Sequence, residues 1–220
     1  MLFCGIDSKA KGWKYGNLRE QKGLRGIPSL AFLEADGSLV IYVPPKKRTV
    51  AGIHSTGERA AEFLRLRAAT AGGDHAAAAQ FLVMQLEERQ VTLDDAVARR
   101  ARVEPTKDQA TTLDRMILHL RISTEMAAKG QKRRHELGPR FLEMWTNGPK
   151  PGLDVSRGFW FAILEWAERE RRTTEFATAL EGLRRSVQHS DPGALWIPNL
   201  LVRYEKILDR LQTAKSNGRV

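Results

Sequence analysis

The sequence of 220 residues has a single cysteine, Cys4, and no Cys-x-x-Cys motif. One cysteine cannot form an internal disulfide bond, and it cannot build a metal site alone. The five histidines are scattered, and no pair has the spacing of a helical metal-binding motif. We therefore predict no metal, no cofactor and no catalytic residue, and the sequence favours a protein that is not an enzyme.

Long apolar runs are also missing. No stretch approaches the roughly 18 to 20 uninterrupted apolar residues of a membrane-spanning helix. The segment that begins at Met1 has neither a basic leader nor an apolar region long enough for a secretory signal. The sequence thus predicts a cytoplasmic protein without membrane contact. A periplasmic location is the alternative if the natural start lies upstream of Met1.

The net charge is +10, while the apolar content of 42% and the charged content of 28% are ordinary for a globular protein. A positive charge of this size favours acidic partners. It does not identify nucleic acid as the partner, because many basic proteins carry solvated, arginine-rich helices.

Two short apolar runs near the N-terminus predict a β-hairpin. Residues 29–33 and 38–43 are each apolar after an initial serine, and Asp36 and Gly37 lie between them. An Asp-Gly pair between apolar runs is the strongest short-range hairpin signal. Upstream, residues 2–6 predict a strand and residues 11–21 a short helix. Downstream, Thr56 is predicted to cap a helix.

Beyond the glycines at positions 72 and 73, the sequence predicts only helices. Thr92 can cap one of them, with Asp95 at the capping-box position. Gly130 should interrupt another. Residues 154–188 predict a helix-turn-helix unit of about 35 residues, close to the length of tetratricopeptide-type repeats. We therefore divide the chain into a domain of residues 1–70 and an all-α domain of residues 71–220, either a bundle or solenoid-like.

The N-terminal part carries a family resemblance. Phe3-Cys4-Gly5-Ile6-Asp7 is followed by Leu24-Arg25-Gly26-Ile27-Pro28-Ser29, and then by the two strands of the predicted hairpin. Residues 2–70 in this order resemble the C-terminal half of a thioredoxin-like domain. The resemblance implies a cis Ile27–Pro28 peptide bond. It also implies a backbone edge at Gly26, Ile27, Pro28 and Ser29 that could bind an extended peptide. Helical extensions of this kind resemble those of some bacterial thioredoxin-like proteins.

The resemblance also shows what is missing. The Cys-x-x-Cys segment of a thioredoxin would lie before Met1, and Cys4 falls in the first predicted strand rather than at a helix N-terminus. We expect Cys4 to be a buried, inert thiol. The strand at residues 2–6 lacks an obvious neighbour, and an unpaired apolar edge favours a homodimer through the incomplete sheet.

The densest basic run of the helical part is a candidate for binding acidic partners. It includes Lys132, Arg133 and Arg134, and Arg140 follows nearby. Such residues can contact phosphates. The alternative interpretation is a solvated helix end, where the helix dipole favours cations.

Three functions from different classes follow from these patterns. The first is a redox-inactive, thioredoxin-like protein that binds protein or peptide partners, with a helical interaction domain. The second is a thiol-disulfide oxidoreductase whose catalytic N-terminal half is missing from this chain. The third is a basic, helical module that binds nucleic acid.

Overall fold

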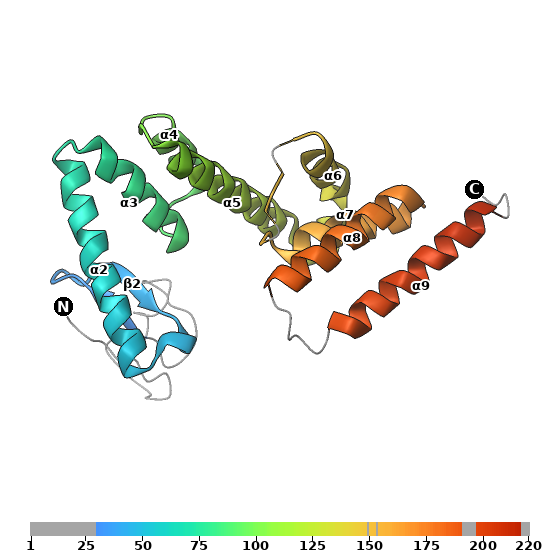
Figure 1. The fold of residues 1–220 in the computed structure, drawn as a ribbon, viewed down its shortest axis with the longest axis horizontal. Helices are drawn as coiled ribbons and strands as arrows, with labels where there is room; N and C mark the ends of the chain where they lie inside the picture. The colour runs from blue at the N-terminus through green and yellow to red at the C-terminus, as the bar shows by residue number, and fades with distance from the viewer. Residues whose placement is uncertain (1–29, 149, 153, 191–196, 217–220) are drawn as a thin grey trace. The chain divides into compact units, whose positions relative to one another are not determined.

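The computed structural model describes residues 30–148, 150–152, 154–190 and 197–216. These residues are mainly helical, and they include one small antiparallel sheet (Figure 1). The chain forms two compact units, Met1–Leu113 and Asp114–Val220. Five N-terminal predictions lie outside the described residues: the strand at 2–6, the helix at 11–21, the state of Cys4, the cis Ile27–Pro28 peptide bond and the peptide-binding edge at 26–29.

The hairpin of the first unit confirms the sequence prediction. Strand β1 (Leu30–Leu33) pairs with strand β2 (Leu39–Val43) in an antiparallel sheet. In the turn, the backbone N–H of Ser38 donates to Asp36 Oδ1 at 2.8 Å, and Gly37 adopts a φ of 81° that favours glycine. The paired positions are Leu30 with Val43, Ala31 with Tyr42, Phe32 with Ile41 and Leu33 with Leu39.

The helix after the hairpin begins earlier than the sequence predicts. A short 3-10 helix, η1 (Pro45–Lys47), precedes α2 (Val50–Ala71), and the Thr49 side chain caps α2 by accepting from the backbone N–H of Gly52 at 3.1 Å. Thr56 lies inside α2 and donates to the Gly52 carbonyl at 2.7 Å. The predicted cap at Thr56 was therefore wrong. Gly52 has a low helix propensity, but α2 includes it because packing in the core stabilises the helix.

Two further helices complete the first unit. Asp74 caps α3 (His75–Glu87) by accepting from the backbone N–H of Ala77 at 2.9 Å. Thr92 caps α4 (Leu93–Arg100), and its hydroxyl also donates to Asp95 at 2.8 Å, which confirms the predicted cap. Helices α2 and α3 share one apolar core with the hairpin: Phe32, Val40, Ile41, Val43, Ala60, Phe63, Leu66, Ala77, Phe81 and Met84.

The core of the first unit thus includes α3, which lies beyond the predicted boundary between residues 70 and 71. Compactness alone does not say which residues belong to a thioredoxin-like domain. The division into residues 1–70 and 71–220 therefore stays a prediction.

A long helix with an interruption leads into the second unit. Helix α5 spans Lys107–Arg133, and Gly130 leaves helical geometry with φ 67° and ψ 172°, as its position in the sequence predicts. The chain then forms the 3-10 helix η2 (Arg134–Leu137) and α6 (Gly138–Thr146). The basic run at residues 129–135 thus includes this break and the first residues of η2.

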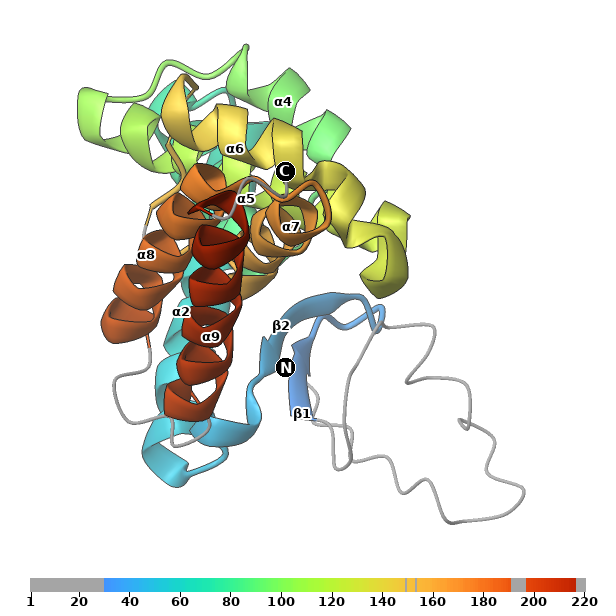
Figure 2. The same cartoon turned by 90° about the vertical axis from the view of Figure 1, so that its right-hand side faces the viewer.

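The second unit is centred on the predicted helix-turn-helix. Helix α7 (Arg157–Arg169) packs against α8 (Thr173–Ser190), which confirms that prediction. Helix α9 (Ile197–Ser216) runs alongside α8 (Figure 2). The fully buried Trp160 of α7 packs edge-on against Trp145 at 4.8 Å between ring centroids and fills the space above Gly182. An apolar core of large aromatic side chains therefore holds α7 in place.

Within the described ranges, every helix is too short or too polar to cross a membrane.

Candidate functional site

The basic patch that the sequence predicts lies around the end of α5, on η2 and on α6. We call Lys132, Arg133, Arg134 and Arg140 the α5–α6 cations. Arg133 forms two hydrogen bonds with Glu136, at 2.6 and 3.0 Å, and Lys129 reaches the same carboxylate at 2.8 Å. The hydrogen bonds from Arg133 and then Lys129 lower the pKa of Glu136 to about 2. Glu136 therefore neutralises much of this part of the patch.

Arg134 has an even more constrained position. Its guanidinium binds both carboxylate oxygens of Glu165 on α7, one of them at 2.8 Å, and it lies 5.1 Å from the ring centroid of Phe161. The hydrogen bond with Glu165 raises the pKa of Arg134. The Arg134 side chain is only 18% exposed. Its geometry is that of a residue that joins η2 to α7.

Arg140 is also paired, since its guanidinium lies 2.8 Å from Glu125 Oε1. Lys132 is exposed, and it is the one residue of the four without an ion pair or hydrogen bond within the described part of the chain. The structure thus brings the four predicted cations to one region of the second unit. It supplies three of them with carboxylate partners of the protein itself.

A second group of polar residues, three of them cations, lies on α9. One face of the helix carries Asn199, Arg203, Lys206 and Arg210, which follow one another at positions i, i+4, i+7 and i+11. We call these residues the α9 strip. The neighbouring apolar face of α9 packs into the core, where Tyr204 lies 6.2 Å from Phe161 and 6.1 Å from Phe176 between ring centroids. This packing fixes the direction in which the strip faces.

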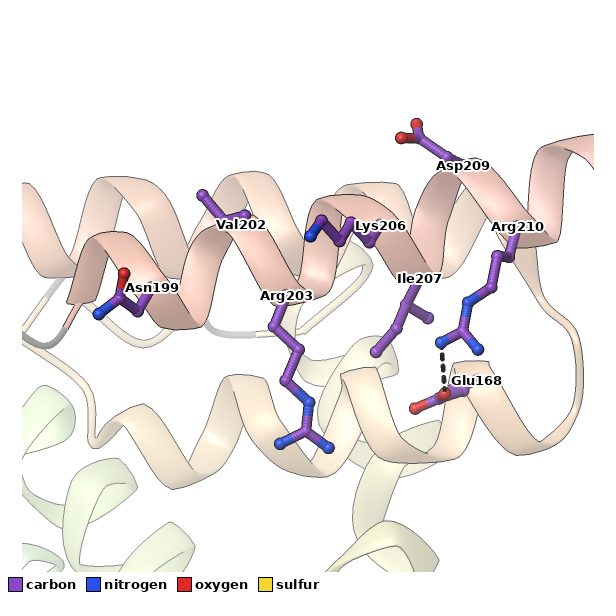
Figure 3. A pocket seen from close by; sticks show the side chains of 8 residues that line it. All are labelled: Glu168, Asn199, Val202, Arg203, Lys206, Ile207, Asp209 and Arg210. Carbon is purple, nitrogen blue, oxygen red and sulfur yellow. Dashed lines mark ion pairs between the residues drawn. The ribbon is translucent and has the colours of Figure 1, made fainter.

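The α9 strip borders an open groove between α7 and α9 (Figure 3). The groove has a volume of about 650 Å³. Arg203 extends from α9 toward α7, whereas the Asp209 carboxylate points away from α7. The lining residues are Glu168 of α7 and, from α9, Asn199, Val202, Arg203, Lys206, Ile207, Asp209 and Arg210.

The charges in this groove are not balanced. Arg210 Nη2 lies 3.9 Å from Glu168 Oε1, which makes a long ion pair. Arg203 and Lys206 have no ion pair or hydrogen bond to any described residue. Glu205, which precedes Lys206 on α9, binds Arg184 of α8 at 2.5 Å. Two cations in the groove are thus left for an external partner.

Glu165 of α7 interacts both with Tyr204 of α9 and with Arg134 of the α5–α6 cations. Burial raises the pKa of Tyr204, and the nearby charge of Glu165 raises it further. Glu165 is the carboxylate that binds Arg134, one helical turn before Glu168. Helix α7 therefore presents one carboxylate to each of the two basic groups.

His119 of α5 is a half-buried titratable group away from both basic groups. Its Nε2 atom is buried without a hydrogen bond in the described structure and lies 3.9 Å from Asp154 Oδ1. Burial lowers the pKa of His119. Among the described residues, no three His, Cys, Asp or Glu side chains gather in a group that could hold a metal ion.

No protein-family model, no curated protein and no solved structure matches this chain. The assignment of the candidate site therefore rests on the geometry and charges of its residues alone.

Sequence reasoning overlooked the α9 strip. The sequence predicts that this region is helical. It does not single out the cations on the polar face of the helix. The signal that could have found the strip is the spacing of Arg203, Lys206 and Arg210 along one helix face. Sequence alone does not show which of these cations have carboxylate partners.

Proposed function

We propose that this chain is a protein-binding protein without thiol-disulfide activity of its own. In this proposal the N-terminal part is thioredoxin-like and presents the edge at Gly26, Ile27, Pro28 and Ser29 to a peptide. The helical second unit docks a segment of a partner protein in the groove between α7 and α9.

The N-terminal half of the proposal rests on the order of elements. The resemblance implies a hairpin directly after residues 26–29 and then a helix packed on the hairpin. Strands β1 and β2 and helix α2 follow that order, and they share a core. This order supports the thioredoxin-like interpretation.

One observation carries the docking half of the proposal: Arg203 and Lys206 have no partner among the described residues, and they lie in a groove that also offers apolar surface. Val202 lines the groove and is 47% exposed, and Ile207 lines it from the buried side of α9. Interfaces between proteins combine apolar contact with a small number of charged or polar groups that set orientation. A groove with both elements fits a protein segment.

The docking groove can be tested with a photo-crosslinking residue placed at Val202 in the full-length protein. The matched control carries the same residue at Ser123, an exposed position of α5 in the same unit. In an extract of the source cells, we expect a protein adduct from position 202 that position 123 does not form. The identified partner, once purified, should bind the wild-type chain and lose affinity for Arg203→Glu.

Two results would contradict the proposal. Identical adducts at both positions would show that the groove is not a docking site, and adducts with nucleic acid alone would favour the nucleic-acid alternative. The absence of redox activity has its own test. In an insulin-reduction assay with dithiothreitol, the chain should give no turnover above dithiothreitol alone, whereas thiol-dependent turnover would support an oxidoreductase.

A further inference from the structure

The free charge of the groove is positive although carboxylates are present in its lining. Glu168 lies closest to Arg210, and the Asp209 carboxylate points away from α7. Neither carboxylate contacts Arg203 or Lys206. A partner that supplies two negative groups to these cations would complete pairs that the described chain leaves open.

The length of the α9 strip sets the size of the matching segment. Asn199 and Arg210 are eleven residues apart on α9, which is about 16 Å at about 1.5 Å per residue. Arg203 and Lys206 are i, i+3 neighbours, whose Cβ atoms lie about 5 to 6 Å apart. Acidic residues one turn apart on a helix have the same spacing, and those at alternate positions of an extended strand lie about 6.6 Å apart.

The composition of the lining favours a polypeptide over a polyphosphate chain. A nucleic-acid backbone carries a negative charge at every nucleotide, so some of its phosphates would lie near Glu168. It also has no group that would use the exposed Val202 in the way an apolar side chain does. A polypeptide segment with separated carboxylates need not place a negative charge near Glu168, and one apolar residue in it can pack against Val202.

We propose that the occupant of the groove is an acidic segment of another protein, with at least two carboxylates and one apolar side chain. The carboxylates bind Arg203 and Lys206, and the apolar side chain packs against the exposed Val202. Asn199 supplies a neutral hydrogen-bonding group at one end of the strip. This inference rests on the proposed docking function and adds the chemistry of the partner.

An unbiased display library of random 16-residue peptides can test the proposal with the full-length protein as target. Selected peptides are measured against wild type and against the double variant Arg203→Glu/Lys206→Glu. The control is Arg102→Glu/Lys107→Glu, which makes the same charge change at two exposed residues outside the groove and outside the α5–α6 cations. The selected peptides should be enriched in Asp and Glu. Their affinity should fall by about tenfold or more in the groove variant and stay within about twofold in the control.

Salt and competitor measurements separate the remaining sources of binding. Peptide affinity should weaken between about 50 and about 200 mM salt, because charged contacts at an exposed groove are screened. A single-stranded RNA oligonucleotide should compete poorly. Stronger binding of the RNA than of any selected peptide, with the same loss in the groove variant, would overturn the inference in favour of a polyanion.

Two other results would overturn it in different ways. Selected peptides that are neutral or basic and lose affinity in Val202→Asp would leave the docking function in place but refute an acidic partner. Selected peptides that bind both double variants as they bind wild type, and are also indifferent to Val202→Asp, would refute the groove as a docking site. Equal losses in the two double variants would show a non-specific effect of net charge and would also refute the inference.

Discussion

Two groups of cations lie on the second unit, and they differ in where the nearest carboxylates are directed. Around the end of α5, Arg133 and Arg134 bind Glu136 and Glu165, one a neighbour in sequence and the other on a facing helix. Along α9, Glu205 is bound to α8, so Arg203 remains without a described partner.

The comparison shows that a dense basic run in the sequence does not by itself leave cations without carboxylate partners. The run around Lys132 has more cations in sequence, yet its arginines pair with carboxylates of α5, η2 and α7. The α9 strip is sparser, but its cations border a groove. The two groups therefore differ in whether their cations already have carboxylate partners among the described residues.

The largest expected effect comes from the packing that supports both groups. A Cβ atom at position 182 would overlap the indole of the fully buried Trp160, so Gly182→Val should force α7 and α8 apart. We expect a loss of about 3 kcal/mol in the free energy of unfolding, measured by urea denaturation. The control Gln188→Val places valine at an exposed position of α8. A loss of equal size in the control would show that helix propensity, not overlap with Trp160, is responsible.

A smaller loss should follow when one pair of the α5–α6 cations is broken. Arg134→Ala removes two hydrogen bonds to Glu165 and the contact with Phe161, and it leaves a partly buried carboxylate without its partner. The expected loss in the free energy of unfolding is about 2 kcal/mol. Lys132→Ala, in the same run, should change it little. If the two variants were equally stable, Arg134 would not have the structural role described here.

The α9 strip should tolerate the same substitution. Arg203→Ala and Lys206→Ala remove exposed cations without described partners, so each should change the free energy of unfolding by less than about 0.5 kcal/mol. Urea denaturation of these variants beside Arg134→Ala gives a direct comparison of the two groups. A loss in Arg203→Ala as large as that in Arg134→Ala would show that α9 depends on this cation for its position.

The smallest expected effect is a change in the pKa of the Glu136 side chain. Glu136 should titrate with a pKa of about 2, and Arg133→Ala should raise that pKa toward the ordinary value because the largest stabilising hydrogen bonds are lost. Because the folded-state pKa is below the unfolded value, the contribution of Glu136 to stability is present above pH 4.5 and is lost as the pH falls toward about 2. NMR titration of the carboxyl carbon measures this pKa directly. An unchanged pKa in Arg133→Ala would contradict the assigned partner.

Local signals predicted the elements that have local causes. The Asp36-Gly37 turn, the Thr92 cap and the interruption at Gly130 each depend on a few neighbouring residues, and the structure confirms them. The start of α2 at Val50 was missed because Gly52 weakens the helical pattern there. The thioredoxin-like interpretation and its edge at residues 26–29 stay predictions.

The sequence by itself determined the mainly helical character of the chain and the position of its hairpin, because periodicity and turn chemistry act over a few residues. It also placed four cations in one short segment. Only the tertiary structure decided that Glu165, far along the chain, pairs with Arg134, and that Glu205 binds α8. Ion pairing depends on distance in space, so the α9 strip became a candidate site only once α7, α8 and α9 were packed together.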